Sequence, residues 1–489
     1  MKFTKQIFRI KKIKHMLLGG IIMFCAPMAL SAKIMLPSVI SDNMVLQQES
    51  EVEIWGWSTK SAEQILVWGS WGSDTLSTKV YQGRWSLKLP TPKSGGPYTL
   101  HIMGHETIKI KNVLVGEVWM CSGQSNMEMP MDSLSPGFAG VIDYKRKIKE
   151  AHYPSVRFFQ VSRRTSNHPQ DSCEGRWIVC TPEEAKGFSA VAYNFGKTIH
   201  EDLKVPVGLL HASWGGTNIE PWIPEELINE NPIYKEELDS LEAYAWWPKD
   251  AGLTYNAMIN PITRFTIAGV IWYQGESNRF FPKTYASLMP LMIDAWRKKW
   301  DIDFPFYYVQ IAPFDYNNEH MAPLVRESQS RSVTHHKTGM IVIHDLVDDI
   351  KNIHPRQKTE VGKRLAAMAL VKTYNKTGYN IDYPSFSSMT LVGNKAEIRF
   401  NHAYNGLMSK GEITEFQIAG ADRIFYPAKA KINKDGVVVW SKKVKRPIAV
   451  RYGFSNTSIP KLYGKNGLPV DIFRTDDWEV PMHKIKRVE

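Results

Sequence analysis

Short apolar segments rich in aromatic and β-branched residues dominate the chain between residues 33 and 112. The segments EVEIWGW, QILVWGSW, RWSLKLP and YTLHI are separated by turn-forming residues such as Gly-Ser-Asp and Ser-Gly-Gly-Pro. Short strands at regular spacing with such turns are typical of a β-sandwich. The pattern therefore predicts an all-β domain over residues 33–112.

Between residues 113 and 385 the apolar segments alternate with longer segments of helical periodicity. The predicted strands are continuously apolar and cover 113–121, 156–161, 207–212, 268–273, 306–312 and 339–345. Apolar residues recur at helical spacing in 188–203, 284–300 and 359–374. Apolar strands that alternate with helices indicate a parallel sheet covered on both faces, so an α/β fold is expected here.

A β-rich pattern returns at Phe386 and continues through KAEIRF, EFQIAG, GVVVW and PIAVRYGF. It predicts a C-terminal β-domain over residues 386–489. The expected order of domains along the chain is β, then α/β, then β.

The first 32 residues have the composition of a secretory signal peptide. Residues 1–15 carry six basic side chains and no acidic one, and the apolar run 16–30 ends at Ser31-Ala32. This run is interrupted by Pro27 and is shorter than the ~20 residues of a membrane-spanning helix. We therefore expect an exported protein, periplasmic or secreted, without stable membrane insertion once residues 1–32 are removed.

Composition and charge narrow the classes of function. The 489 residues are 43% apolar and 22% charged, which excludes a disordered, collagen-like or coiled-coil chain. The formal net charge of +12 falls to +6 without the six basic residues near the start. This net charge is small and the basic residues are not clustered, so the sequence does not indicate nucleic acid as a partner.

Three cysteines follow the predicted signal peptide. Cys173 and Cys180 flank the short run EGRWIV and are spaced for a small disulfide loop, whereas Cys121 belongs to a predicted strand. An oxidising compartment permits a disulfide, but the sequence alone does not fix the pairing.

Small and polar residues follow four of the predicted strands. These segments are SGQSNM (122–127), SWGGTN (213–218), QGESN (274–278) and, after a loop, NIHP (352–355). Ligands of α/β sheets bind beyond the carboxyl ends of the strands, so these segments are expected to meet at one site.

The four segments contain the groups that acyl transfer needs. Ser125 is a candidate nucleophile at a strand-to-helix turn, and His354 is a candidate general base. Backbone N–H groups near Gly215 and Gly216, and the amides of Gln274 or Asn278, are candidate donors to an oxyanion. Taken singly, such a serine is more often a helix cap and such glycines a turn; the case depends on all four segments together.

The same segments resemble a known family. GQSNMEMP, SWGGTNIEPWIP, IWYQGESN and IHPRQKTEVGKRLA resemble the four blocks of the SGNH hydrolases, and more narrowly the sialate O-acetylesterase family of carbohydrate esterases. LPSVISDNMVLQ and RYGFSNTSIPKLYGKNGLPVDIFRTDDW extend the resemblance over the whole chain after residue 32. The resemblance implies a flavodoxin-like, three-layer SGNH domain over residues 113–385.

The resemblance also implies roles for individual residues. Ser125 would be the nucleophile, His354 the base and then the acid, and the N–H groups of Ser125 and Gly216 would face the oxyanion. The third block departs from the Gly-x-Asn-Asp pattern of the superfamily, so Gln274 is favoured as a further donor, with Asn278 second. Side chains expected to bind substrate are those of Gln124, Asn126, Trp214 and Glu276.

The group that orients His354 is left open by the sequence. SGNH enzymes often have an aspartate three residues before the histidine, where this chain has Lys351, and relatives have one two residues before, where it has Asn352. The nearest acids are Asp348 and Asp349. Three candidates remain for the group that orients the imidazole. Asp349 would complete a triad, whereas Asn352 or a backbone carbonyl would hold the ring in a Ser–His dyad.

Other chemistries have weaker support. His335 and His336 are adjacent rather than one helical turn apart and no His-Glu-x-x-His occurs, so neither a metal nor any other cofactor is expected. Trp214, Trp222, Trp246 and Trp247 lie in predicted loops of the α/β region and are candidates for lining a sugar site, although such rings often serve only to dock loops.

The expected function is an exported serine esterase that removes O-acetyl groups from carbohydrate through an acetyl-enzyme intermediate. The resemblance points to O-acetylated sialic acid, with acetylxylan or another polysaccharide as the alternative substrate. A carbohydrate-binding protein without catalysis is the alternative of another class. A lipase or protease is less well supported because the loops after the strands are polar. The oligomeric state is not indicated.

Overall fold

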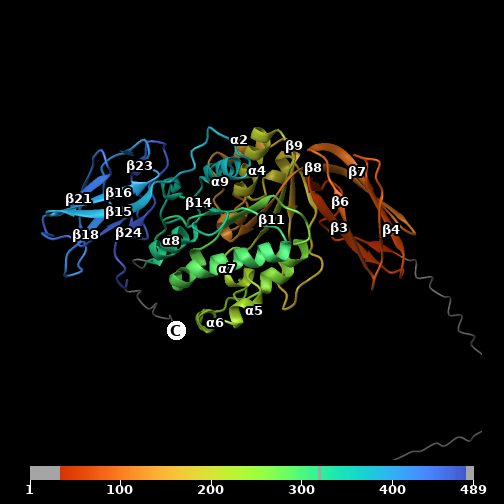
Figure 1. The fold of residues 1–489 in the computed structure, drawn as a ribbon, viewed down its shortest axis with the longest axis horizontal. Coiled ribbons are helices and arrows are strands. Elements are labelled where there is room, and N and C mark those ends of the chain that lie inside the picture. Colours follow the sequence, from red (N-terminus) through yellow and green to blue (C-terminus); the bar gives the residue numbers. More distant parts are fainter. Residues whose placement is uncertain (1–32, 318–320, 481–489) are drawn as a thin grey trace, which may run out of the picture.

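The computed structural model describes residues 33–317 and 321–480, and it shows two β-rich regions on opposite sides of a central α/β region (Figure 1). The predicted signal peptide lies outside the described residues. No helix within the described ranges is long and apolar enough to cross a membrane.

The central sheet contains six parallel strands, in the order β9-β11-β8-β12-β13-β14. Their bounds are β8 Thr107–Gly123, β9 Tyr153–Gln160, β11 Val207–Ser213, β12 Gly269–Tyr273, β13 Phe306–Val309 and β14 Thr338–Ile341. A seventh strand, β10 (Trp177–Cys180), is antiparallel at the edge. The predicted strands and the parallel sheet are confirmed.

The strand order differs in one place from that of flavodoxin. In flavodoxin the order is 2-1-3-4-5. Here β11, the third parallel strand in the chain, lies beside β8, the first, and β9 lies outside β11. The chain still switches direction at β8, because β11 is on one side of it and β12 on the other.

Helices cover both faces of this sheet. Alternate residues of β8 point to opposite sides: Val118 and Met120 pack with helices α7 (Pro282–Trp300) and α8 (Met321–Ser332). Trp119 and Cys121 pack with α4 (Ala190–Leu203) and α9 (Lys358–Lys372). The three predicted helices correspond to α4, α7 and α9 and are confirmed to within a few residues at each end.

The N-terminal region consists of two sheets. Their buried apolar residues belong to the same continuous cluster as those of α7. One contains β1 (Ile34–Met35), β3 (Glu51–Ser58) and β6 (Arg84–Pro90). The other contains β2 (Val45–Gln47), β4 (Gln64–Gly69), β5 (Leu76–Lys79), β7 (Gly95–Met103) and the first part of β8. Because β8 continues into the central sheet, the boundary expected at residue 112 falls inside a strand.

The C-terminal region has its own apolar core between two antiparallel sheets. One is made of β15 (Ser385–Val392), β16 (Lys395–Asn401), β20 (Lys429–Ile432) and β21 (Val437–Trp440). The other is made of β18 (Phe416–Ala419), β19 (Tyr426–Pro427), β22 (Ala449–Tyr452) and β24 (Phe473–Arg474), and a short pair joins β17 (Leu407–Ser409) to β23 (Leu462–Gly464). The first strand begins one residue before the expected start at Phe386.

Shorter elements fill the loops of the central region. They are α1 (Ser125–Glu128), α2 (Tyr144–Lys149), α3 (Pro182–Ala185), α5 (Glu225–Asn229), α6 (Pro232–Ser240), and the single turns η1 (Glu220–Trp222), η2 (Tyr255–Ile259), η3 (Asn260–Ile262), η4 (Glu276–Phe280) and η5 (His344–Leu346). The three described cysteines are free, so the spacing of Cys173 and Cys180 does not produce a disulfide in this structure.

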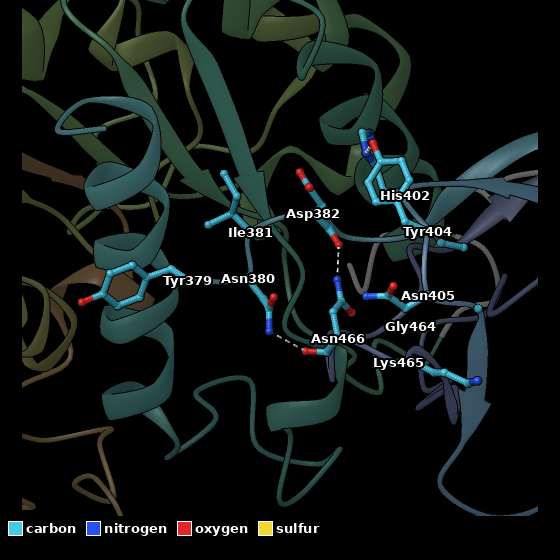
Figure 2. A pocket seen from close by; sticks show the side chains of 12 residues that line it. Tyr379, Asn380, Ile381, Asp382, His402, Tyr404, Asn405, Gly464, Lys465 and Asn466 are labelled. Atoms are coloured by element: carbon cyan, nitrogen blue, oxygen red, sulfur yellow. Dashed lines mark hydrogen bonds between the residues drawn. The ribbon is translucent and has the colours of Figure 1, made fainter. Parts of the chain in front are cut away.

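A pocket open to solvent lies where the segment after α9 meets the C-terminal sheets (Figure 2). The amide of Asn380 donates to the carbonyl oxygen of Asn466 at 3.0 Å, and the amide of Asn466 donates to that of Asp382 at 2.8 Å. These bonds fasten the connecting segment to the C-terminal region. None of the site residues expected from the sequence lines this pocket.

Candidate active site

Ser125 lies at the carboxyl end of β8, at the point where the sheet switches direction. Gly123, the last residue of β8, has a φ of 141°, and a side chain there would lie 2.2 Å from the carbonyl oxygen of Tyr273. The N–H of Gln124 donates to that same oxygen at 3.0 Å, and helix α1 begins at Ser125. Glycine therefore allows the strand to turn closely past β12 into the helix.

The glycines that follow β11 lie directly beside Ser125. A methyl group on Gly215 would come within 3.1 Å of the Cβ of Ser125. The N–H of Gly215 donates to Glu128 Oε2 at 2.6 Å, and the carbonyl oxygen of Gly216 accepts from the hydroxyl of Ser277 at 2.9 Å. Within the described ranges, the N–H groups of Ser125 and Gly216 donate to no acceptor. Both are thus available to bind an anionic oxygen.

The amides of Gln274 and Asn278 are used within the protein, which differs from the expected oxyanion role. Gln274 Nε2 donates to the carbonyl oxygen of Thr217 at 3.2 Å and to Asn278 Oδ1 at 2.7 Å. Asn278 Nδ2 donates to the carboxylate of Glu220 at 3.1 Å. Both side chains are buried. With both N–H groups occupied, Gln274 has none left for an oxyanion, and the N–H groups of Asn278 point to a buried carboxylate.

Three of the four side chains expected to bind substrate are buried and link loops instead. Gln124 Oε1 accepts the N–H groups of Gly275 at 3.2 Å and Ser277 at 3.4 Å. Asn126 and Glu276 are also buried, with exposed fractions of 0% and 2%. The fourth, Trp214, is partly exposed. The expectation of substrate contact is therefore corrected for Gln124, Asn126 and Glu276.

A buried polar network beneath Ser125 joins three of the four segments. Lys358 Nζ donates to Asn126 Oδ1 at 2.5 Å, and Asn126 Nδ2 donates to Glu276 Oε1 at 2.6 Å. The same amide donates to the carbonyl oxygen of Ile353 at 3.1 Å. The residue after Ser125 therefore holds the residue before His354, and this contact brings the two candidate catalytic groups to one place.

Burial moves both charged groups of this network toward neutrality. It lowers the pKa of Lys358 to about 7, against the opposing charges of Glu276 and Asp348. It raises the pKa of the Glu276 carboxyl, while the hydrogen bond from Asn126 and the charge of Lys358 oppose the shift. Within the described residues, Glu276 Oε2 is buried without a hydrogen-bond partner. Both shifts have the same cause, since burial destabilises the ionic form of each group.

His354 is held in its neutral form by its surroundings. Burial lowers the pKa of its imidazole to about 4, the positive charge of Lys358 adds to this effect, and a hydrogen bond with the backbone of Gly137 opposes it. The ring of Phe138 packs against the imidazole with centroids 4.8 Å apart. No hydrogen bond joins Ser125 and His354 in the described part of the chain; such bonds are often long before substrate binds.

The side chains of Asp349 and Asn352 contact backbone rather than the imidazole. Asp349 is exposed, and its Oδ1 accepts the N–H of Lys351 at 2.9 Å. Asn352 Oδ1 accepts the N–H of His354 at 3.0 Å. The structure therefore differs from the expectation that one of these side chains orients the ring. The group that acts on the imidazole is instead the backbone of Gly137, which raises the pKa of the ring.

The candidate tryptophans fall into two groups. Trp222 is fully buried, and its Nε1 donates to the hydroxyl of Thr217 at 3.0 Å, so it belongs to the core. Trp246 and Trp247 are exposed, and Trp214 Nε1 donates to the carbonyl oxygen of Trp246 at 3.1 Å. The indole of Trp247 lies over Gly216, where a methyl group would come within 2.4 Å of it.

Glu128 and Lys358 are site residues that the sequence reasoning did not single out. Both lie inside the motifs quoted above: Glu128 is three residues after Ser125, and Lys358 is four residues after His354. A spacing of three or four residues places a side chain one helical turn away, and this was the signal in the sequence that could have identified them. Glu128 pairs with Arg163 at 2.9 Å. Burial raises the pKa of its carboxyl, whereas Arg163 and the N–H of Gly215 lower it.

No group of three or more potential metal-ligating side chains occurs among the described residues. His335 Nε2 contacts Asp294 at 2.8 Å and His336 Nε2 contacts Asp303 at 2.9 Å, each as a separate surface pair.

A family profile matches the chain over residues 115–371, which spans β8 to α9. It describes carbohydrate esterases that are sialic acid-specific acetylesterases. The matched range contains Ser125, Gly216, Gln274 and His354.

Related proteins match the chain over most of its length. The mouse sialate O-acetylesterase is 30% identical, over 79% of this chain and 80% of its own. The human sialate O-acetylesterase is 28% identical, over 78% of this chain and 79% of its own. The crystal structure of a carbohydrate acetylesterase from Xanthomonas citri superposes with a TM-score of 0.83 at 33% identity, covering 91% of this chain and all of that one.

Proposed function

Since the chain belongs to the sialic acid-specific acetylesterase family of carbohydrate esterases, we propose that its substrate is an O-acetylated sialic acid. It is a carboxylic ester hydrolase that removes O-acetyl groups from carbohydrate, as its relatives are named for doing. The observation that carries the proposed site is the meeting of Ser125, the free N–H of Gly216 and the His354 loop at the end of β8.

In the first half of the reaction, Ser125 Oγ attacks the carbonyl carbon of the acetyl ester while His354 accepts the hydroxyl proton. The carbonyl oxygen becomes an oxyanion and receives the N–H groups of Ser125 and Gly216. As the bond from that carbon to the sugar oxygen breaks, the imidazolium returns the proton to the leaving alcohol. The acetyl group stays on Ser125.

In the second half, a water molecule attacks the acetyl-enzyme and His354 accepts its proton. The tetrahedral intermediate collapses, the proton passes from His354 to Ser125 Oγ, and acetic acid leaves and loses its own proton to water. A neutral imidazole is needed at the start of both halves, and the low pKa of His354 keeps that form populated at neutral pH. Its hydrogen bond with the backbone of Gly137 supports a Ser–His dyad in which a backbone group orients the ring.

The test is hydrolysis of 9-O-acetyl-N-acetylneuraminic acid, acetylxylan and p-nitrophenyl acetate by the wild type and by Ser125→Ala. We expect turnover of the sialate ester, with kcat reduced by about 1000-fold or more in the variant. An exposed serine, Ser172, provides the control variant Ser172→Ala. Activity on xylan alone would refute the sialate substrate, and full activity of Ser125→Ala would refute the nucleophile.

A second comparison tests the orienting group. Because the carboxylate of Asp349 accepts a backbone N–H and is exposed, Asp349→Ala should lower kcat much less than His354→Ala does. Equal losses in the two variants would instead make Asp349 a full member of a triad.

We extend the proposal to fold family, domains and localisation. The parallel sheet between two layers of helices supports an SGNH domain over residues 113–385, flanked by β-domains over 33–112 and 386–489. The composition of residues 1–32 supports export, periplasmic or secreted. Expression with its own N-terminus, fractionation of the cells and N-terminal sequencing would test this, since a retained, unprocessed chain would refute it.

A further inference from the structure

Three exposed aromatic side chains gather in the loop that follows α6. Tyr244, Trp246 and Trp247 have exposed fractions of 44%, 63% and 39%. Their rings contact one another, with centroids 5.1 Å apart for Tyr244 and Trp247 and 5.9 Å apart for the two tryptophans. We call this group the aromatic cluster. Large apolar side chains that remain exposed side by side indicate a binding surface rather than core packing.

The aromatic cluster borders the candidate active site. Trp247 covers Gly216, whose neighbour Gly215 lies against Ser125. The carbonyl oxygen of Trp246 accepts from the indole of Trp214, the residue that leads into those glycines. A molecule whose ester lies at Ser125 therefore extends toward the cluster. Aromatic faces of this kind suit the C–H face of a sugar ring, which is apolar, while the hydroxyl groups at its edge stay in water.

A cation stands beside the same cluster. Arg279, in η4, is half-buried, and its guanidinium lies over the rings of Phe280 at 4.2 Å and Tyr316 at 5.3 Å. Its Nη1 donates to the carbonyl oxygen of Glu276 at 3.1 Å, and its charge interacts with the hydroxyl of Tyr244. Among the described residues it forms no ion pair with a carboxylate. The charge of the buried Glu276 acts on this guanidinium without pairing with it directly, so its outer N–H groups can still bind an incoming carboxylate.

We propose that the aromatic cluster and Arg279 form the subsite for the sugar of the substrate, with the cluster supporting the ring and Arg279 binding a carboxylate on it. The inference rests on the proposed esterase function and goes beyond it by naming the side chains that select an acidic sugar over a neutral one. Arg279 belongs to the same turn whose Ser277 holds Gly216, so the carboxylate site and the ester site share a rigid support.

Arg163 is a second arginine near the site, and it suits this role less well. Its guanidinium pairs with Glu128 at 2.9 Å and lies over Trp214 at 5.9 Å. A substrate carboxylate would compete there with a carboxylate that the protein already supplies. Among the described residues Arg279 forms no direct ion pair with a carboxylate; the charge of the buried Glu276 acts on it without contact.

The test uses the full chain and three acetate esters: 9-O-acetyl-N-acetylneuraminic acid, an O-acetylated methyl glucoside without a carboxylate, and p-nitrophenyl acetate. In Arg279→Gln the ratio of kcat/KM for the acidic sugar to that for the neutral sugar should fall about 10- to 100-fold, the range for a lost charge-assisted hydrogen-bond pair. Arg279→Lys keeps the positive charge but loses the planar, two-pronged guanidinium, so it should give an intermediate ratio. If Arg279→Gln does not fold, Arg279→Lys takes its place in the test.

In Trp246→Ala, kcat/KM for both sugar esters should fall by about 3- to 10-fold relative to p-nitrophenyl acetate, because only the sugars reach the cluster. Two exposed side chains far from the site in sequence, Arg84 and Tyr404, give the controls Arg84→Gln and Tyr404→Ala. Both controls should leave all three activities unchanged.

The outcomes separate this inference from the proposed function. An unchanged ratio in Arg279→Gln, or an equal loss on all esters in Trp246→Ala, overturns the subsite while leaving the esterase in place. A wild type that hydrolyses p-nitrophenyl acetate but no sugar acetate overturns the proposed function itself. A wild type active only on the neutral sugar overturns the carboxylate role of Arg279.

Discussion

The chemistry of His354 depends on a lysine that never touches the substrate in the proposed reaction. Lys358 lies four residues further along, at the start of α9, and is fully buried against Asn126. Its ammonium destabilises an imidazolium nearby, so it helps burial to keep the base neutral. A positive charge beside a general base favours the unprotonated base. It does so here without being needed for the oxyanion, which binds the N–H groups of Ser125 and Gly216 in the proposed reaction.

Removing that charge should move the acidic limb of the pH profile. A neutral imidazole is the active form, so kcat/KM falls as the pH drops through the pKa of His354. In Lys358→Met the depressing charge is gone, the pKa rises from about 4 toward its ordinary value, and the limb should shift to higher pH. The measurement is kcat/KM for p-nitrophenyl acetate from pH 3.5 to 8. Lys363→Met, an exposed lysine of the same helix, is the control, and an unmoved limb in Lys358→Met would contradict the electrostatic role.

At this scale the sequence locates some groups of the site and not others. Ser125, Gly216 and His354 follow strand ends or stand in motifs, and the structure brings their loops together. Gln274 and Asn278 were expected to donate to an oxyanion, but their amides bind Thr217 and Glu220. The partner of a buried amide depends on which loops the fold places around it, and no local pattern carries that information.

Elements are predictable here where their residues are apolar throughout or on one face. The strands of the central sheet and helices α4, α7 and α9 follow from such patterns. Helix α8 does not, because Met321–Ser332 contains mostly polar residues. Arg326 and Gln329 are nevertheless fully buried, since Arg326 Nη2 donates to the carbonyl oxygen of Ser455 and Gln329 Nε2 to that of Gln274. The apolar buried residues of α8 end at Val325 and the buried residues beyond it are polar, so the hydrophobic period is too short to detect.

The end of β8 tolerates no side chain at Gly123 without strain. Gly123→Ala would force a side chain into a left-handed conformation, at a cost of about 1–3 kcal/mol, and against the carbonyl oxygen of Tyr273, which belongs to β12 and has no room to move. Both the free energy of unfolding and kcat should fall, since Ser125 is displaced with the turn. Gly187→Ala is the control, because nothing lies within 4 Å of a methyl group there. Denaturant titration and esterase assays measure the two effects, and a Gly123→Ala variant as stable and active as that control would contradict the strain.

The whole molecule is joined through buried polar contacts at both of its junctions. At the N-terminal junction, Glu117 in β8 accepts from Gln48 Nε2 at 2.6 Å and from the hydroxyl of Tyr374 at 2.7 Å. This carboxylate connects the N-terminal sheets with the end of α9. The strand that carries it crosses from one sheet into the other. Asn112, at the expected boundary, takes a left-handed φ of 56° but does not end the strand, so the sequence pattern put a boundary inside β8.

At the C-terminal junction the side chain of Glu327 in α8 binds Arg474 in β24 through both oxygens, at 2.9 and 3.0 Å. Only 9% of the Arg474 side chain is exposed, so Glu327→Gln leaves a buried guanidinium with a weaker partner. We expect the free energy of unfolding to fall by about 1.5–3 kcal/mol with kcat unchanged, because the bond holds two regions together without reaching Ser125. In the exposed pair of Arg164 and Glu174, the matched variant Glu174→Gln should cost no more than about 1 kcal/mol. Chemical denaturation of the two variants in parallel tests this: equal effects would mean that the pair of Glu327 and Arg474 stabilises the junction no more than a solvent-exposed pair does.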